Sequence, residues 1–76
     1  MNLYTIYDTV AKECGPVFEA KNDGTATRSY LSMLKSQNLR SDEYLMYSIG
    51  RFDHESMELF IHDKELVNVA ELNNGI

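Results

Sequence analysis

The stretch GPVFEAKNDGTATRSYLSMLKSQ, residues 15–37, decides the fold because its hydrophobic period changes from two to about 3.6 along its length. Near its start, apolar and charged residues alternate in the order Phe18, Glu19, Ala20 and Lys21. This alternation is typical of a strand with one buried and one solvated face. Pro16 lacks a backbone N–H, so it can only open such a strand or lie at the edge of a sheet. The stretch therefore predicts a strand, a sharp corner and a helix.

The corner is marked by Asn22-Asp23-Gly24, ahead of a helix expected at about residues 24–38. An Asn or Asp at the N-cap accepts a hydrogen bond from a helix amide that has no partner inside the helix, and an acidic group there complements the helix dipole. One stripe of the helix should be buried: Ala26, Tyr30, Met33, Leu34 and Gln37. The opposite stripe is polar: Arg28, Ser32, Lys35 and Ser36. We therefore expect the helix to cover one face of a sheet.

Two further strands flank this unit. Residues 3–7, LYTIY, are apolar, β-branched or aromatic on both alternating sets, which indicates a strand at the centre of the sheet. Residues 8–15 are expected to form a connection, as a single helical turn or a wide loop. Residues 44–52 predict a second strand, in which Gly50 marks a bulge or the close approach of another backbone.

The last third of the chain reads as a hairpin followed by a final apolar segment. Residues 53–56 are polar and predict the turn, and residues 57–62 predict the returning strand. A second turn is expected at residues 63–65. The run from 66 to 72 suits either a strand or a helix, and both alternatives stay open.

These elements predict a single α+β domain over residues 1–76. It contains a small antiparallel sheet of four to five strands with one amphipathic helix packed on one face. The order is β-β-α-β-β, with a further strand if the last apolar run is extended.

Size and cysteine content limit the class of protein. A chain of 76 residues buries only about 60% of the surface that its unfolded form exposes, so we expect a homodimer that adds burial. Residues 44–52 would lie at the sheet edge and pair with the same strand of a second copy. The single cysteine, Cys14, cannot form an internal disulfide, as is usual in a reducing cytoplasm. We find no signal peptide and no apolar run long enough to span a membrane, so a soluble protein is expected.

The net charge of -5 is unevenly distributed along the chain. Residues 1–41 hold five Lys or Arg against four Asp or Glu, whereas residues 42–76 hold two against eight. Nucleic-acid affinity comes mainly from Lys and Arg that displace counterions from phosphates. Any contact with a polyanion is therefore expected on the helix and its flanks, while the acidic second half would repel phosphate or bind a basic partner.

Most of residues 3–53 also resembles a known family. The resemblance is carried by LYTIYDTVAKECGPVFEAKND and by the later IGRFD, and covers most of residues 3–53. Its most specific segment is the run Tyr7-Asp8, Gly15-Pro16-Val17-Phe18 and Ala20-Lys21-Asn22-Asp23, followed by Arg28. In these residues the chain is similar to the small nonstructural protein of gokushoviruses, the single-stranded DNA phages of the microvirus family. The resemblance implies a DNA-binding or replication-associated role in the cytoplasm of the host bacterium, and it supplies no catalytic residues.

Enzymatic and metal chemistry find little support in the sequence. A nucleophilic pair of Cys14 with His54 or His62 is conceivable, but the residues around Cys14 match no cysteine-hydrolase signature. The two histidines would lie too far apart along the hairpin to share an ion within one chain, which leaves only a metal shared between subunits. Neither Gly15 nor Gly24 belongs to a phosphate-binding loop. We therefore expect no enzyme, no cofactor and no metal site.

Aromatic and cationic residues supply the candidate binding site. Proteins that bind single strands combine cations with rings on which bases stack, at about 1–3 kcal/mol per base. The candidates are Arg28, Lys35, Lys21, Arg40, Tyr44 and Tyr47. The alternative is that the tyrosines belong to the core or to a dimer interface, and that Arg28 and Lys35 form an ordinary solvated helix face. Two functions follow: weak, sequence-tolerant binding of single-stranded DNA in phage replication, or an acidic module that binds a phage or host protein without contacting nucleic acid.

Overall fold

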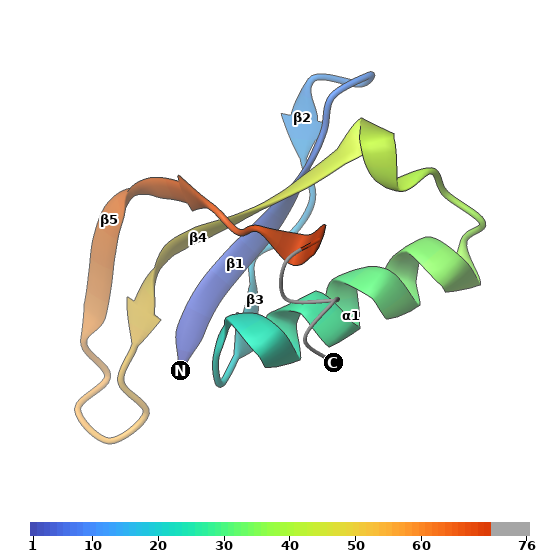
Figure 1. Cartoon of the computed structure of the whole chain (residues 1–76). Coiled ribbons are helices and arrows are strands. Elements are labelled where there is room, and N and C mark those ends of the chain that lie inside the picture. Colours follow the sequence, from blue (N-terminus) through green and yellow to red (C-terminus); the bar gives the residue numbers. More distant parts are fainter. Residues whose placement is uncertain (71–76) are drawn as a thin grey trace.

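The computed structural model describes residues 1–70 as a curled antiparallel sheet with one helix across one of its faces (Figure 1). The elements are β1 (Asn2–Asp8), β2 (Glu13–Cys14), β3 (Phe18–Ala20), α1 (Asp23–Ser36), the 3-10 turn η1 (Ser41–Glu43), β4 (Tyr44–Phe52) and β5 (Leu59–Leu66). The predicted α+β class is confirmed. The order is β-β-β-α-β-β, with one short strand more before the helix than the sequence predicted.

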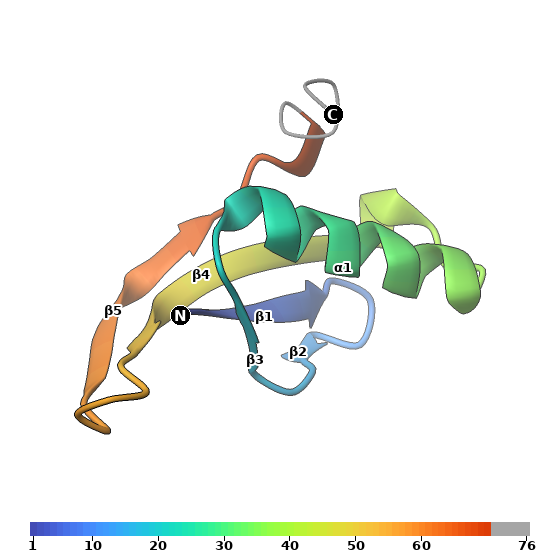
Figure 2. The same ribbon diagram turned by 90° about the horizontal axis from the view of Figure 1, so that it is seen from below.

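Strand β1 lies in the interior of the sheet, as its two apolar faces predicted. Both β2 and β3 pair with one edge of β1, β4 pairs with its other edge, and β5 pairs with the outer side of β4. Since β3 and β4 are each antiparallel to β1, they are parallel to one another. Helix α1 is the crossover connection between them, and Figure 2 shows it in a layer of its own on one side of the strands.

The expected connection between residues 8 and 15 is instead a tight hairpin that contains β2. The Asp8 carboxylate accepts hydrogen bonds from the N–H groups of Val10 at 2.9 Å and Ala11 at 3.1 Å, and Lys12 adopts a left-handed φ of 61°. The turn brings Glu13 opposite Asp8 and Cys14 opposite Tyr7. A strand of two residues is too short to show a hydrophobic period, so the sequence could not reveal it.

Strands β2 and β3 form one interrupted outer strand. Residues 15–17 separate them, and Pro16 therefore lies at the sheet edge, as predicted from its missing donor. The Gly15 N–H still donates to the Ile6 carbonyl at 3.0 Å, and the Thr5 hydroxyl donates to the Gly15 carbonyl at 3.0 Å. These two bonds hold the interruption against β1.

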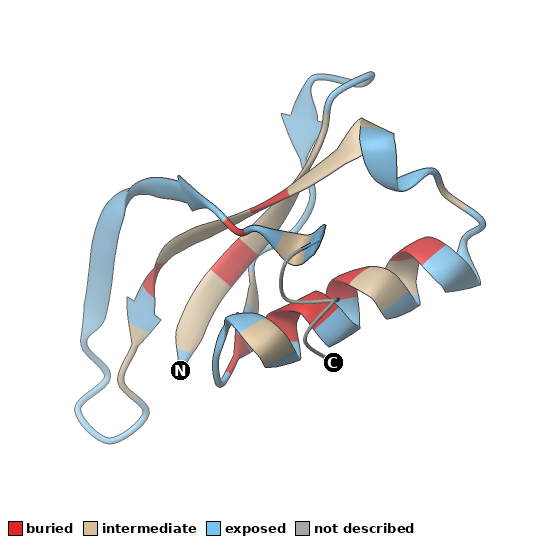
Figure 3. Ribbon diagram, in the orientation of Figure 1, coloured by how far each residue is buried: buried red, intermediate tan, exposed pale blue. Residues whose placement is uncertain are grey.

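The core lies between α1 and the helix-facing side of β1, β3 and β4, with one residue contributed after β5 (Figure 3). The buried hydrophobic residues are Tyr4, Ala20, Ala26, Tyr30, Leu34, Met46 and Val67. The predicted helix stripe is confirmed for Ala26, Tyr30 and Leu34. Met33 is only half-buried and Gln37 is exposed, because Gln37 is the C-cap residue beyond the last helical turn. Thr27, which was not among the predicted residues, is buried, and its hydroxyl donates to the Asp23 carbonyl at 2.8 Å.

Two buried tyrosines attach the helix to the sheet, one at its first residue and one at its middle. The Tyr4 hydroxyl, on β1, donates to Oδ1 of Asp23 at 2.6 Å. The Tyr30 hydroxyl, on α1, donates to the Tyr44 carbonyl at 2.7 Å, where β4 begins. Burial, and then the hydrogen bond to Asp23, raise the pKa of Tyr4 from 10.0 to about 12. The two rings therefore fill the core while their polar ends are satisfied at its rim.

The helix begins where the sequence placed its cap. Asn22 is the N-cap residue, and its side-chain oxygen accepts a hydrogen bond from the Thr25 N–H at 2.9 Å. Asp23 follows as an acidic residue in the first turn and Lys35 as a basic residue in the last, both favourable in the field of the helix dipole.

The predicted edge position of residues 44–52 is wrong. Strand β4 is paired on both sides, with β1 and with β5, so it cannot pair with a second copy of the chain. The predicted turn at residues 63–65 is also wrong, because β5 continues to Leu66. All eight residues of β5 are exposed, so a charged run can occupy this strand without burying a charge. The hairpin turn itself is confirmed, since the Asp53 carboxylate accepts from the Glu55 N–H at 2.9 Å.

Gly50 marks both a bulge and a close backbone approach, as predicted. The register between β4 and β5 shifts between Ser48 and Gly50. A Cβ atom on Gly50 would lie 2.2 Å from the Phe60 carbonyl oxygen, which no side chain tolerates. Of the last apolar run, Leu66 is extended, Val67 is buried, and residues 69–70 are helical, whereas its end lies outside the described residues.

Replacing Tyr30 by Ala is expected to lower the free energy of unfolding by about 3–5 kcal/mol, because it empties the centre of the core. Tyr30→Phe keeps the ring, so it should lose only about 1–3 kcal/mol, the cost of leaving the Tyr44 carbonyl without its donor. Urea unfolding measures both values. Ser32→Ala, on the exposed side of α1, is the control and should change stability by less than about 0.5 kcal/mol. A Tyr30→Ala protein as stable as its parent would remove Tyr30 from the core.

Alkaline pH is expected to destabilise the protein through Tyr4. Its pKa is raised from 10.0 to about 12 on folding, so the folded state retains the proton that the unfolded state releases. This stabilisation is complete below about pH 10 and is lost as the pH rises through about 12. The stability difference between the parent and Tyr4→Phe should therefore shrink across that window in urea unfolding. A difference that stays constant from pH 8 to pH 12 would contradict the raised pKa of Tyr4, and with it the burial and the Asp23 hydrogen bond that cause it.

Candidate functional site

The solvent-facing side of α1 carries cations and hydroxyls. We call its exposed residues Arg28, Ser32, Lys35 and Ser36 the cationic face. Arg28 and Lys35 are two turns apart, about 10 Å along the axis at 1.5 Å per residue. Asp23, at the first position, is the single acidic residue of α1, and it accepts the Tyr4 hydroxyl. Within residues 1–70 neither Arg28 nor Lys35 forms a salt bridge.

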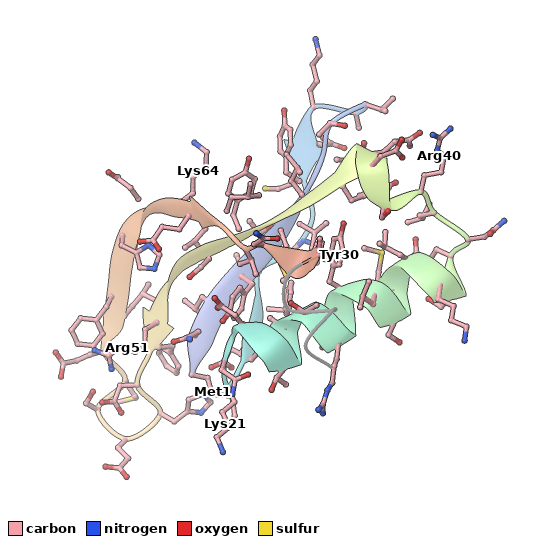
Figure 4. The ribbon with its side chains drawn as sticks, in the orientation of Figure 1. Met1, Lys21, Tyr30, Arg40, Arg51 and Lys64 are labelled. Atoms are coloured by element: carbon pink, nitrogen blue, oxygen red, sulfur yellow. The ribbon has the colours of Figure 1, made fainter. Side chains whose placement is uncertain are left out.

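Two more candidate cations lie beyond the two ends of the helix. Figure 4 shows Lys21 at the start of α1 and Arg40 past its end. Lys21 is exposed. Arg40 is exposed but engaged, because its guanidinium binds the Asp42 carboxylate with two hydrogen bonds, Nε to Oδ1 at 3.2 Å and Nη2 to Oδ2 at 2.8 Å. The four predicted cations thus lie on α1 or just beyond its ends, with the charge of Arg40 partly neutralised.

The two candidate tyrosines do not join these cations. In β4 the side chains alternate, so Tyr44 shares the helix-facing side with Met46 while Tyr47 lies on the opposite face of the sheet. Tyr44 packs against the core, and burial together with the nearby carboxylates of Asp8 and Glu43 raises its pKa. The cationic face points away from the sheet. The six candidates therefore do not form one continuous surface of cations and rings.

An acidic arm, which we define as residues 53–66, extends from the sheet as the β4–β5 turn and β5 (Figure 1). Five carboxylates lie in it against one Lys: Asp53, Glu55, Glu58, Asp63 and Glu65. Large apolar side chains are exposed between them, with exposed fractions of 57% for Leu59, 42% for Phe60 and 79% for Ile61. Among the described residues β5 pairs only with β4, so its outer edge is open. An uninterrupted apolar run such as Leu59-Phe60-Ile61 is typical of a strand buried on both faces, so the exposure of β5 could not be predicted from it.

Other side chains fix this arm on the rest of the molecule. His54 Nε2 lies 2.6 Å from Oε2 of Glu19 on β3. The Arg51 guanidinium lies 4.3 Å from the centre of the Phe60 ring. These contacts give the acidic arm a defined direction relative to the sheet.

A groove that the sequence did not predict lies between α1 and the outer strand formed by β2 and β3. We call it the α1–β3 groove. Its volume is about 660 Å³, within the range of ligand sites. Its lining residues include Ile6, Glu13, Cys14, Phe18, Met33 and Tyr44. The feature of the sequence that corresponds to this groove is the four-residue spacing of Ser29, Met33 and Gln37. It places the three residues on a stripe of α1 beside the buried one.

The residues considered for catalysis or metal binding lie apart. Cys14 is exposed beside the groove, whereas His54 binds Glu19 and His62 Nδ1 lies 2.7 Å from the Asp63 carbonyl. Within residues 1–70 no group of three or more His, Cys, Asp or Glu residues could hold a metal ion. In the same portion of the chain, no helix combines the length and the apolar character that crossing a bilayer requires.

Comparison with known proteins gives one match. The sequence model of a family described as Phage ORF5 protein matches residues 1–72, which is nearly the whole chain. No curated protein and no solved structure matches the sequence. The match supports a phage protein. This agrees with the broader part of what the resemblance to gokushovirus proteins implies.

Proposed function

Because this chain belongs to the Phage ORF5 protein family, we propose that it is a nonstructural phage protein that binds single-stranded DNA. It would associate weakly and without sequence preference with the phage genome during replication, in the cytoplasm of the host bacterium, as the gokushovirus resemblance implies. It would act by binding alone, with no catalytic step.

The observation that carries this proposal is the cationic face. Phosphate contacts are made by Lys and Arg and also by Ser and Thr hydroxyls. The cationic face combines both kinds of group, with Arg28 and Lys35 in no salt bridge within the described residues. Lys21 extends the row beyond the start of α1, and Arg40 extends it beyond the end. A strand of phosphates running along α1 would therefore meet three or four positive charges.

The placement of the tyrosines favours binding through the phosphates over binding by base stacking. Base stacking would require rings beside the cations, but Tyr44 packs against the core and Tyr47 lies on the other face of the sheet. The proposal therefore relies on backbone electrostatics. Such binding is sequence-tolerant, weak and strongly dependent on salt. The acidic arm would repel the strand and so keep it on the helix layer.

The log–log slope of affinity against salt should be about -2 to -3, from three or four contacts at roughly -0.7 each. Changing Arg28 and Lys35 together to Ala is expected to flatten the slope by about 1.4 and to weaken binding to every sequence. Both side chains are exposed, so the fold should be retained. Fluorescence anisotropy of labelled oligonucleotides across a salt series measures the slope.

The matched control is Arg51→Ala with Lys64→Ala, which removes the same charge from outside the helix layer (Figure 4). It should leave the slope nearly unchanged, as should Tyr47→Leu. Direct contact through α1 would be ruled out if the Arg28 and Lys35 double variant kept the parental slope. It would equally be ruled out if the parent failed to bind at about 20 mM salt, where binding should be strongest.

The acidic arm supports a second candidate function, a module that binds a basic protein of the phage or host. Leu59, Phe60 and Ile61 are exposed on an open strand edge among carboxylates, a combination that suits a strand or loop bearing Lys or Arg. Absence of DNA binding at low salt would leave this function as the better account.

We also propose a homodimer, formed by the open outer edge of β5 in place of the interior strand β4. Edge-to-edge pairing would satisfy the backbone groups of β5 and cover Ile61. Two acidic arms repel, so self-association should strengthen as salt rises, opposite to DNA binding.

Ile61→Glu is expected to keep the protein monomeric in sedimentation at about 100 µM. Val10→Glu is the matched control, because Val10 is also exposed but lies in the β1–β2 turn, and it should dimerise like the parent. A parent protein that sediments as a monomer of 8.7 kDa at every salt concentration would refute the dimer.

A further inference from the structure

The α1–β3 groove has two walls that come from different elements. Ser29, Met33 and Gln37 form one wall, at spacings of four residues along the side of α1. The other wall is the outer strand from Glu13 to Glu19, which is interrupted at residues 15–17. Two small residues leave the space between the walls open: Ser29 on the helix and Gly15 in the interruption of the outer strand.

The floor of the groove is apolar and only partly covered. It consists of half-buried side chains that pack against the core: Ile6, Phe18, Met33, Leu39 and Tyr44. Their inner sides contact the core while their outer sides face the groove. An apolar ligand laid here would remove that surface from water, which is the main favourable contribution to association.

The rim of the groove is acidic. Asp8, Glu13 and Glu19 line it, and none of its described lining residues is a Lys or Arg. The Asp8 carboxylate is held by the N–H groups of Val10 and Ala11, so its charge has a fixed position. Glu19 is shared with His54, which leaves Asp8 and Glu13 as the charges most available to a ligand. The raised pKa of Tyr44, caused by burial and then by Asp8 and Glu43, agrees with a negative potential at this end.

We propose that the α1–β3 groove binds a short, basic amphipathic helix of a partner protein. The wall from Ser29 to Gln37 is about 12 Å long at 1.5 Å per residue, which matches about two helical turns. Leu-like side chains at spacings of three and four residues would cover Met33, Phe18 and Tyr44. Lys or Arg on the flank of the same helix would reach Asp8 and Glu13.

This chemistry separates the groove from the DNA-binding face. The cationic face carries Arg28 and Lys35 on the solvent side of α1, while the groove uses the neighbouring stripe of the same helix. Phosphate would be repelled by the acidic rim, and a cationic peptide would be repelled by the cationic face. The two ligands therefore select different sides of one helix.

The test uses a labelled synthetic peptide of about ten residues, with Leu on one helical face and Lys at all other positions. Fluorescence anisotropy gives its affinity for the full chain. Ser29 lines the groove and is exposed, so in a variant that combines Cys14→Ser with Ser29→Cys the rate of alkylation by iodoacetamide reports whether the peptide occupies that place. Glu13→Lys reverses a rim charge, and Glu58→Lys, in the acidic arm, is the matched control for the change in net charge.

We expect the Leu–Lys peptide to bind and to slow alkylation of the cysteine introduced at Ser29 severalfold. Glu13→Lys should weaken binding about five- to tenfold, Glu58→Lys by less than about twofold, and the Arg28 and Lys35 double variant not at all. A Leu–Glu peptide of the same pattern, or the Leu–Lys peptide with its order scrambled, should bind much more weakly. The proposal is overturned if alkylation of the cysteine introduced at Ser29 is unchanged at saturating peptide, or if Glu13→Lys and Glu58→Lys weaken binding equally. Neither result bears on DNA binding, which is measured with oligonucleotides.

Discussion

The position of the helix on the sheet depends on two hydroxyl groups that must find acceptors at the edge of a small core. Tyr4 and Tyr30 supply the largest buried rings, and burying either ring without a partner for its hydroxyl would cost about 1–3 kcal/mol. Each hydroxyl reaches its acceptor in one placement of α1, Asp23 near the start and the Tyr44 carbonyl beyond the end. Apolar contacts alone would permit the helix to rotate or slide, whereas these two bonds select one orientation. The side of α1 that faces solvent, and hence the placement of Arg28 and Lys35, follows from them.

The sequence segregates charge along the chain, and the fold turns that segregation into separate surfaces. Four of the seven cations lie in α1 or just beyond its ends, and five of the twelve carboxylates lie in the acidic arm. The α1–β3 groove is a third surface, in which acids from the first half of the chain surround apolar side chains. A net charge of -5 therefore describes no single face of the molecule, and arguments from it alone against a polyanionic ligand are weak.

Local features of the structure were predictable where the backbone geometry at one position favours one type of residue. Asn22 caps α1, Pro16 interrupts an edge strand, and Gly50 occupies a bulge where Phe60 leaves no room for a Cβ atom. Errors arose where the answer depended on distant partners. Nothing in residues 44–52 says whether one or two strands flank them, and the charged residues 63–65 resemble a turn unless the strand is exposed on both faces. The candidate site was only partly predictable for the same reason: the helical period places Arg28 beside Lys35, and strand alternation separates Tyr44 from Tyr47, but only the fold shows that Tyr44 packs against the core.

The interior position of β1 has a consequence for how the chain reaches this structure. The neighbours of β1 on one edge, β2 and β3, follow within a few residues, so a local hairpin can close early. The other edge pairs with β4, in a register where Asn2 opposes Arg51 and the chain between them includes all of α1. Until β4 has been synthesised, that edge of β1 exposes unsatisfied backbone groups, and the loop-closure entropy for its pairing is still to be overcome. Folding of this small domain is therefore governed by a long-range contact, and it should proceed more slowly than that of a helical bundle of similar length.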